Sequence, residues 1–505
     1  MSSKPAHAKG FLITTAIDYP SGRPHLGHAY EKICTDVIAR YKRLQGFDVH
    51  FSTGTDEHGM KILRCAQKQG KTPQEYVDAM SAHFRQLCSA LLISYDDFIR
   101  TTEARHVKTA QEIFRRINKK GEIYKGVYEG LYCVDCETYY MRKDLVGDKC
   151  PVHGTEPDVV REESYFFQMG KYREKLIEHM KKHPEFILPA SRRNEMLSRL
   201  KEPLKDLSVS RTGFSWGVPV PIDEKHVQYV WMDALINYLS TVGWPDEKSK
   251  KFWPAAVHVI GKDIVWHHTV IWGSILMAAG IELPRTVYVH GFVNIRGEKM
   301  SKSKGAVVDP VALANEYGAD SLRYFLVSEI PFGEDGDFSV AALIARNNGE
   351  LVNNLGNLAN RILTFIHSKN AGKIPKPSKY DALDEEVEKR IAEHADKAAS
   401  LMEDYNLQGA LDELMKLSKF GNEYFQAKEP WKKENANCLY LGANLLRSLA
   451  ITLSPFIPQS AEKMWDYLNL EGSVHKQKWG SAKEMKIAGG HLIKKPGPLF
   501  SKFKQ

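Results

Sequence analysis

The chain has 505 residues, which is too long for a single hydrophobic core and predicts two to four domains. Hydrophobic and aromatic contents of 43% and 10% are ordinary for a globular enzyme, and a net charge of +8 permits a nucleic-acid partner without requiring one. We find no run of about 18 apolar residues and no signal-peptide core at the start, which argues against membrane insertion and predicts a cytoplasmic protein.

Residues 11–30 predict a buried strand, a turn rich in Pro and Gly, and the start of a helix. His25 and His28 are three apart, so they share a face at the helix N-terminus, where unpaired N–H groups and a positive dipole favour phosphate. Gly27 between them leaves room for a flat ring against the backbone. An isolated H-x-G-H pattern is as often chance as function, so this stretch alone decides nothing.

The next segments continue an α/β pattern. A helix is predicted over residues 30–44 and a second strand over 47–51, followed by the polar run 52–59. Ligands of open α/β sheets bind beyond the carboxyl ends of strands, which makes Asp56 a candidate binding residue; the alternative is a helix cap. Helices then follow over about 72–119.

A short, aromatic, turn-rich segment begins at Gly121 and contains a metal-binding pattern. Two tight pairs, Cys133 with Cys136 and Cys150 with His153, are separated by thirteen residues. Three thiolates and an imidazole complete a tetrahedral zinc site with no position left for water, so we expect a structural Zn²⁺. The alternative is that the two pairs are unrelated and bind no metal. We expect the other four cysteines to be free thiols.

Strands resume after about residue 225, at 257–260 and 286–290, so the nucleotide-binding fold is split in two. A loop with Lys299 and Lys302 follows and could close over a polyphosphate, although alone it could be a solvated basic loop. Beyond it, Asp309 and Asp320 are predicted helix caps. Amphipathic helices then predict a bundle over residues 340–369, 383–405, 408–428, 436–453 and 458–468.

H-x-G-H after the first strand and K-M-S-K-S after a late one form the paired signature of class I aminoacyl-tRNA synthetases. Over nearly its full length the chain resembles the methionyl-tRNA synthetases of that class, of the bacterial type. The matching segments are 16–19, 25–28, 54–59, the cysteine knuckle, 229–234, 261–264, the lysine loop, 357–361 and 430–431.

The resemblance implies an α/β fold: a split Rossmann-type parallel-sheet catalytic domain with an inserted zinc-knuckle module and a C-terminal α-helical bundle. The implied domains are a first catalytic half (1–120), a connective insert (121–225), a second catalytic half (226–295), a stem-contact region with the lysine loop (296–345) and an anticodon-binding domain (346–505).

The resemblance further implies attachment of methionine to its initiator and elongator tRNAs through methionyl-adenylate, with ATP and Mg²⁺. The implied catalytic residues are His25, His28, Lys299 and Lys302, and ATP binding adds Gly27, Gly261 and Asp263 to the two lysines. The methionine pocket would comprise Ala16, Ile17, Tyr19, Trp231, Ala234, Tyr238, Ile264 and His268, with Asp56 on the α-ammonium. The anticodon readers would be Asn357, Arg361 and Trp431.

Each role has a plainer alternative. Trp231 and Tyr238 could be core packing, Arg361 a surface ion pair, and Trp431 a helix-end anchor. A purely hydrophobic pocket discriminates only weakly between apolar side chains of similar size. We therefore expect the Tyr19 hydroxyl or a His268 N–H to separate methionine from leucine.

Rival functions fit less well. Synthetases for isoleucine, valine or leucine need a large editing domain that residues 120–225 cannot hold beside the zinc module. Small nucleotidyltransferases lack the bundle and the lysine loop, and a non-catalytic tRNA-binding paralogue would be expected to lose the histidines or Lys299. The shape of the methionine pocket is left open, because Leu235, Trp266 and His267 differ from the residues that are common in the family. In the knuckle, His153 stands where a fourth cysteine is common. Without a C-terminal tRNA-binding domain we expect a monomer.

Overall fold

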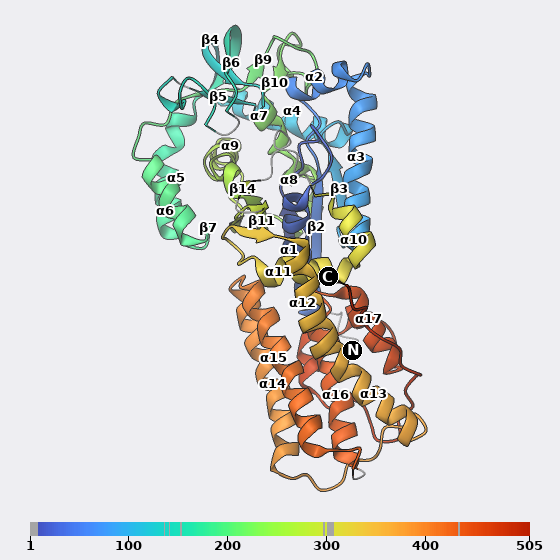
Figure 1. The fold of residues 1–505 in the computed structure, drawn as a ribbon. Helices are drawn as coiled ribbons and strands as arrows, with labels where there is room; N and C mark the ends of the chain where they lie inside the picture. Colours follow the sequence, from blue (N-terminus) through green and yellow to red (C-terminus); the bar gives the residue numbers. More distant parts are fainter. Residues whose placement is uncertain are drawn as a thin grey trace.

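The computed structural model describes residues 9–504 apart from 136, 141, 152–153, 296–297, 300–307 and 433–434. Within these residues a six-stranded parallel sheet has the order β3-β2-β1-β11-β12-β7 (Figure 1). Its strands are β1 (Gly10–Thr15), β2 (Asp48–Thr55), β3 (Asp97–Arg100), β7 (Ile187–Leu188), β11 (Ala256–Gly261) and β12 (Thr286–His290).

The sheet reverses its strand order at its centre. From β1 the chain runs outward through β2 and β3, whereas β11 and β12 extend the sheet on the other side of β1. All residues of β1, β11 and β12 are buried, as expected for parallel strands covered on both faces. The carboxyl ends of β1 and β11 therefore flank a topological switch point, where open α/β sheets bind their ligands.

Helices flank the sheet, but the helical run predicted over about 72–119 is interrupted by strand β3. They include α1 (Leu26–Leu44), α2 (Met60–Lys68), α3 (Pro73–Ala90), α4 (Ala104–Lys119), α7 (Val230–Ala234), α8 (Asn237–Ser240), α9 (Trp272–Ala279), α10 (Pro310–Tyr317) and α11 (Ala319–Glu329). The helix predicted from residue 30 begins four residues earlier, because His25 caps it. No helix among the described residues is long and apolar enough to cross a membrane.

The expected insert is a separate antiparallel sheet of order β5-β4-β6-β8, at the top of Figure 1. It is built from β4 (Ile123–Cys133), β5 (Thr138–Tyr140), β6 (Asp158–Phe167) and β8 (Leu207–Ser208), with the pair β9 (Ser210–Arg211) and β10 (Val227–Gln228) beside it. In the chain, α5 (Arg173–Lys182) and α6 (Ala190–Arg199) follow β6 and precede β8. Strand β7 also lies within residues 121–225, yet it pairs with β12 at the edge of the central sheet.

Beyond residue 339 the structure is a helical bundle, at the bottom of Figure 1. Its helices are α12 (Val340–Arg346), a π-helical stretch (Asn347–Gly356), α13 (Asn357–Lys369), α14 (Ala382–Glu403), α15 (Leu407–Lys428), α16 (Ala436–Leu453) and α17 (Pro458–Tyr467). The first three together fill the predicted segment 340–369, and each of the other four agrees with a predicted segment to within two residues. The segment after residue 470 packs back on the bundle, where the Trp479 indole N–H donates to the Ala395 carbonyl at 3.1 Å.

Buried charge joins the bundle to the α/β layers. The Arg323 guanidinium, fully buried on α11, lies 2.7 Å from the Asp36 carboxylate on α1 and donates to the Phe456 and Pro455 carbonyls. Asp320 was predicted to cap α11, but that prediction is wrong: Gly318 is the N-cap. The Asp320 carboxylate accepts instead from the Ser460 N–H at 2.6 Å, in the first turn of α17.

Candidate functional site

A cleft of about 1570 Å³ opens at the switch point. Every described residue that the sequence analysis assigned to catalysis, ATP or methionine lines it, apart from Lys299. They are Ala16, Ile17, Tyr19, His25, Gly27, His28, Asp56, Trp231, Ala234, Tyr238, Gly261, Asp263, Ile264 and His268. Four segments far apart in sequence therefore converge on one cavity.

The two histidines build the N-terminus of α1 as a reciprocal capping box. The Gly27 N–H donates to His25 Nδ1 and the His25 N–H donates to His28 Nδ1, both at 3.1 Å, and the rings stack with centroids 3.8 Å apart. Because each Nδ1 accepts, a neutral ring carries its proton on Nε2. Both rings thus present an N–H donor from a helix terminus whose dipole already favours anions.

Gly27 leaves room for the same packing. A Cβ at this position would lie 2.9 Å from His25 Cε1 and 3.1 Å from Nδ1, closer than ordinary carbon contacts. The neighbouring Asp18 is 2.6 Å from the Nζ of Lys32, which is fully buried, and its other oxygen is 3.9 Å from His28 Nε2. This buried ion pair supports the end of the cleft where α1 begins.

The lysine loop starts at the rim of the cleft. Strand β14 (Glu298–Lys299) pairs with β13 (Val293–Ile295), with Lys299 opposite Asn294, and Val293 itself lines the cavity. β13 also pairs with β15 (Gly336–Phe338). The side chain of Lys299 and the whole of Lys302 lie outside the described residues.

The apolar end of the cleft is aromatic. Trp231 stacks on His267 with centroids 3.9 Å apart, and the buried Tyr238 donates from its hydroxyl to His268 Nε2 at 2.7 Å. His268 Nδ1 lies 3.0 Å from the Ile264 carbonyl, which can only accept, so Nδ1 carries the proton. Burial lowers the pKa of His268 to about 4, and the ring is neutral.

This hydrogen bonding bears on the expected role of His268 in separating methionine from leucine. Its Nδ1–H is directed at the Ile264 carbonyl, and its Nε2 accepts from the Tyr238 hydroxyl. In this structure His268 fixes Tyr238 and offers no N–H to the cavity. The Tyr19 hydroxyl lies 3.0 Å from both the His58 carbonyl and Glu137 Oε1.

Asp56 is a buried carboxylate whose Oδ1 has no hydrogen-bond partner. Burial raises its pKa well above the usual 3.8, and the nearby charges of Asp233 and Glu137 raise it further. A buried carboxylate is normally paired. Asp56 therefore fits a cationic ligand group, and the alternative of a helix cap is not what the structure shows, since Gly59 is the N-cap of α2.

The sequence analysis missed an ion pair in the same cleft. Glu31 Oε2 is 2.9 Å from His290 Nε2, and both residues line the cavity. Burial raises the pKa of Glu31; burial lowers the pKa of His290, but Glu31 raises it above its usual value. Both signals were present in the sequence, because Glu31 follows His28 by three helical positions and His290 ends a predicted strand.

Two of the four predicted zinc ligands can be described. Cys133 ends β4 and Cys150 follows the next hairpin, and both side chains are 1% exposed. Their Sγ atoms lie 3.7 Å from the hydroxyls of Thr155 and Tyr140, respectively. Cys136 and His153 lie outside the described residues. Buried thiols on neighbouring turns fit a Zn²⁺ site of the predicted kind.

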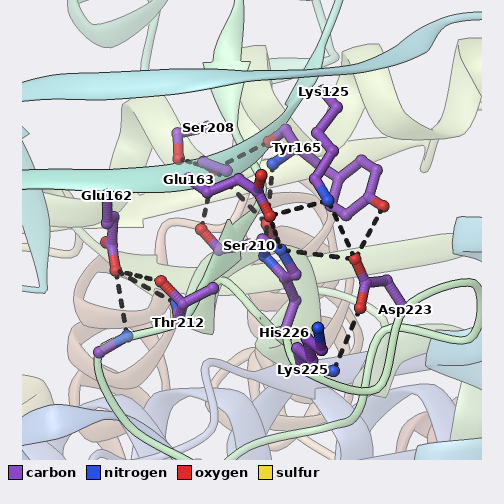
Figure 2. Close-up of polar contacts among 12 residues, drawn as sticks. Lys125, Glu162, Glu163, Tyr165, Ser208, Ser210, Thr212, Asp223, Lys225 and His226 are labelled. Atoms are coloured by element: carbon purple, nitrogen blue, oxygen red, sulfur yellow. Dashed lines mark hydrogen bonds and ion pairs between the residues drawn. The ribbon is translucent and has the colours of Figure 1, made fainter.

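Among the described residues, a different group has the composition of a metal site: Glu163, Asp223 and His226, whose candidate ligand atoms lie within 4.8 Å of one another (Figure 2). The ammonium group of Lys125 already pairs with the two carboxylates of this cluster. Lys125 Nζ is 2.7 Å from Glu163 and 3.2 Å from Asp223, and its hydrogen bond lowers the pKa of Glu163. The Ser210 hydroxyl lies 3.0 Å from His226 Nδ1. We interpret the cluster as an ion-pair network that ties β6 to the segment before β10.

The predicted anticodon residues gather on one face of the bundle. Asn357 Nδ2 donates to Asn422 Oδ1 at 2.9 Å, and the Arg361 guanidinium lies 5.5 Å from the Trp431 ring, which is 41% exposed. Arg361 also donates to Gln426 at 3.0 Å. The result is an exposed aromatic ring beside a guanidinium and three side-chain amides, the chemistry that unstacked RNA bases require.

Comparisons with known proteins agree with this geometry. The family model described as tRNA synthetases class I (M) matches residues 11–157 and 140–363, and the anticodon binding domain of methionyl tRNA ligase matches residues 374–505. The chain is 45% identical to the methionine–tRNA ligase of Brucella suis, over 98% of both chains, and 45% identical to that of Caldanaerobacter subterraneus, over 97% of this chain and 78% of the relative. A solved structure of Mycobacterium tuberculosis methionyl-tRNA synthetase in complex with methionyl-adenylate superposes with a TM-score of 0.94, at 40% identity, covering 97% of this chain and 99% of that one.

Proposed function

Because this chain belongs to the class I methionyl-tRNA synthetases, we propose that it activates methionine with ATP and transfers the methionyl group to tRNA. The observation that carries this proposal is the composition of the cleft. Two imidazole N–H donors stand at a helix N-terminus at one end, and a buried carboxylate with one unpartnered oxygen lies near aromatic side chains at the other. One end suits phosphate and the other suits an amino acid.

In the first step a carboxylate oxygen of methionine attacks the α-phosphorus of ATP, which enters as its Mg²⁺ complex, and pyrophosphate leaves. His25 and His28 would donate from Nε2 to the phosphate oxygens as charge builds there. Lys299 and Lys302 would neutralise the β- and γ-phosphates, and Gly27, Gly261 and Asp263 would seat the nucleoside. Positioning and electrostatics suffice for this reaction, so no side-chain nucleophile is needed.

The amino acid would be held at both ends. Asp56 would pair with the α-ammonium group, while the thioether would lie among Ala16, Ile17, Trp231, Ala234, Tyr238 and Ile264. Polarisable sulfur favours aromatic surroundings. With His268 fixing Tyr238, and with the Tyr19 hydroxyl directed at Glu137 and the His58 carbonyl, discrimination against leucine falls to the shape of this aromatic wall.

In the second step the 2′- or 3′-hydroxyl of the tRNA's terminal adenosine would take the methionyl group and release AMP. The bundle would read the anticodon, with Trp431 stacking a base and Arg361 and Asn357 hydrogen-bonding base edges. We assign this role to initiator and elongator tRNA alike.

Cys133, Cys136, Cys150 and His153 would hold a Zn²⁺ ion, which would pin the β4–β5 hairpin and take no part in the reaction. The five domains would have the bounds that the resemblance implies, except that β7 belongs to the central sheet. A monomeric state and a cytoplasmic location stay predictions; light scattering on the purified protein tests the first, and fractionation of cells tests the second.

The decisive experiment is ATP–pyrophosphate exchange with methionine, leucine and isoleucine supplied in turn. We expect exchange with methionine alone, and aminoacylation of tRNA that depends on methionine. Exchange driven by leucine or isoleucine would favour another class I synthetase, and tRNA binding without exchange would favour a non-catalytic paralogue. In the Lys299→Ala variant adenylate formation should slow far more than methionine binding weakens; unchanged exchange would refute the role of Lys299.

A further inference from the structure

Glu137 is an insert residue whose carboxylate reaches into the cleft. It lies in the turn between β4 and β5, directly after Cys136, and it lines the cavity although its side chain is only 3% exposed. Its φ of +49° is in the left-handed region, which non-glycine residues seldom adopt. Contacts made by this residue must offset that unfavourable backbone conformation.

The first of these contacts caps a catalytic-domain helix. The N-cap of α2 is Gly59, which has no side chain to satisfy the helix N–H groups. Glu137 Oε1 accepts from the Lys61 N–H in the first turn at 2.8 Å, so a residue of the insert performs the capping. Lys61 Nζ in turn donates to the Asp135 carbonyl at 2.8 Å. The hairpin is thereby docked on the segment that follows Asp56.

The remaining contacts reach the methionine pocket. The Tyr19 hydroxyl lies 3.0 Å from Glu137 Oε1, and the Tyr229 hydroxyl, one residue before α7 and its Trp231, donates to the Glu137 carbonyl at 2.8 Å. A Cβ on Gly59 would lie 2.7 Å from the Tyr19 hydroxyl and 2.8 Å from Glu137 Oε1, so only glycine lets the two side chains meet. Tyr132 also donates to the second carboxylate oxygen.

We propose that Glu137 is a positioning residue of the amino-acid site, which holds the Tyr19 side chain against the substrate through the hydrogen bond between their side chains. The inference rests on the proposed function, since it assumes that methionine occupies this end of the cleft. Glu137 touches no reacting atom; it acts through Tyr19. The insert would thereby shape the pocket of a domain to which it does not belong.

The test is a double-mutant cycle on the full-length enzyme, read out as kcat and KM for methionine in pyrophosphate exchange. Glu137→Ala should raise the KM about 10- to 100-fold with kcat changed less than about threefold, because a hydrogen bond to a charged group is lost in ground and transition states alike. Tyr19→Phe should raise the KM in the wild type but hardly at all in the Glu137→Ala background. Glu137→Gln keeps an oxygen acceptor and should stay within about threefold of wild type.

Glu163→Gln is the matched control, because it alters an exposed carboxylate on β6 of the same sheet and should leave the KM unchanged. Active-site titration and measurement of the zinc content show how much of each variant is correctly folded, and so distinguish a positioning role of Glu137 from a role in folding. Additive effects of the two substitutions, a Gln variant as impaired as the Ala variant, or a reduced active fraction with normal KM would each overturn the inference. Wild-type enzyme without methionine-dependent exchange would instead defeat the proposed function.

Discussion

Replacement of Asp56 by asparagine should separate binding from stability. In the structure the carboxylate is buried with Oδ1 unpaired, and methionine's ammonium would supply the missing cation. Breaking a buried ion pair costs about 3 kcal/mol, which corresponds to about a 150-fold rise in the KM for methionine. The pair persists in the transition state, so kcat and the KM for ATP should change little.

The same substitution should not destabilise the free enzyme. Folding raises the pKa of Asp56, so this group contributes stability below its ordinary pKa of 3.8 that is lost as the pH rises through the higher folded value. At neutral pH the variant lacks this buried charge, and its melting temperature should equal or exceed that of the wild type. Exchange kinetics and thermal melts with and without methionine check both parts. A folded variant with a KM within threefold of wild type would refute the assignment.

Three further predictions follow from the described contacts. Burial raises the pKa of Asp36, but Arg40 and Arg323 lower it to about 2, so Asp36→Asn should cost about 2 kcal/mol in urea unfolding at pH 7. That difference should shrink as the pH falls from about 4 through 2, and a pH-independent difference would contradict the linkage. Gly27→Ala should slow single-turnover adenylate formation about 10- to 100-fold by displacing the His25 ring, with methionine binding unchanged; a normal rate would show that the ring tolerates the Cβ. Arg361→Ala should raise the KM for tRNA about tenfold without affecting exchange, and an equal loss in both assays would place Arg361 in folding instead.

Most of the architecture could be predicted because local signals and tertiary structure agree. The predicted helix over 436–453 forms with those bounds, and the strands at 257–260 and 286–290 form within two residues of the predicted ones. Asp309 caps α10 as expected, since its carboxylate accepts from the Val311 N–H at 2.8 Å. Periodicity and capping residues carry this information within a few positions of the chain.

Features that depend on distant partners could not be predicted. Strand β7 has two residues and exists because β12 offers a free edge, and Asp320 caps a helix 140 residues away instead of its own. The hydrogen bonds that occupy both nitrogens of His268 join residues four and thirty positions apart. The sequence shows only that residue 268 is a histidine. The folded structure is needed to show that both of its ring nitrogens already have hydrogen-bond partners.

Strand β7 also determines how this protein could be shortened or recombined. A deletion from residue 121 to 225 would strip the parallel sheet of its outermost member and leave the Val287 and Tyr288 backbone facing solvent. Cuts placed close to Ile123 and Phe167 would instead remove one antiparallel ribbon whose two ends are paired neighbours. Any chimaera that exchanges this ribbon, with Cys133 and Cys150, between relatives should therefore be spliced at the ribbon's base.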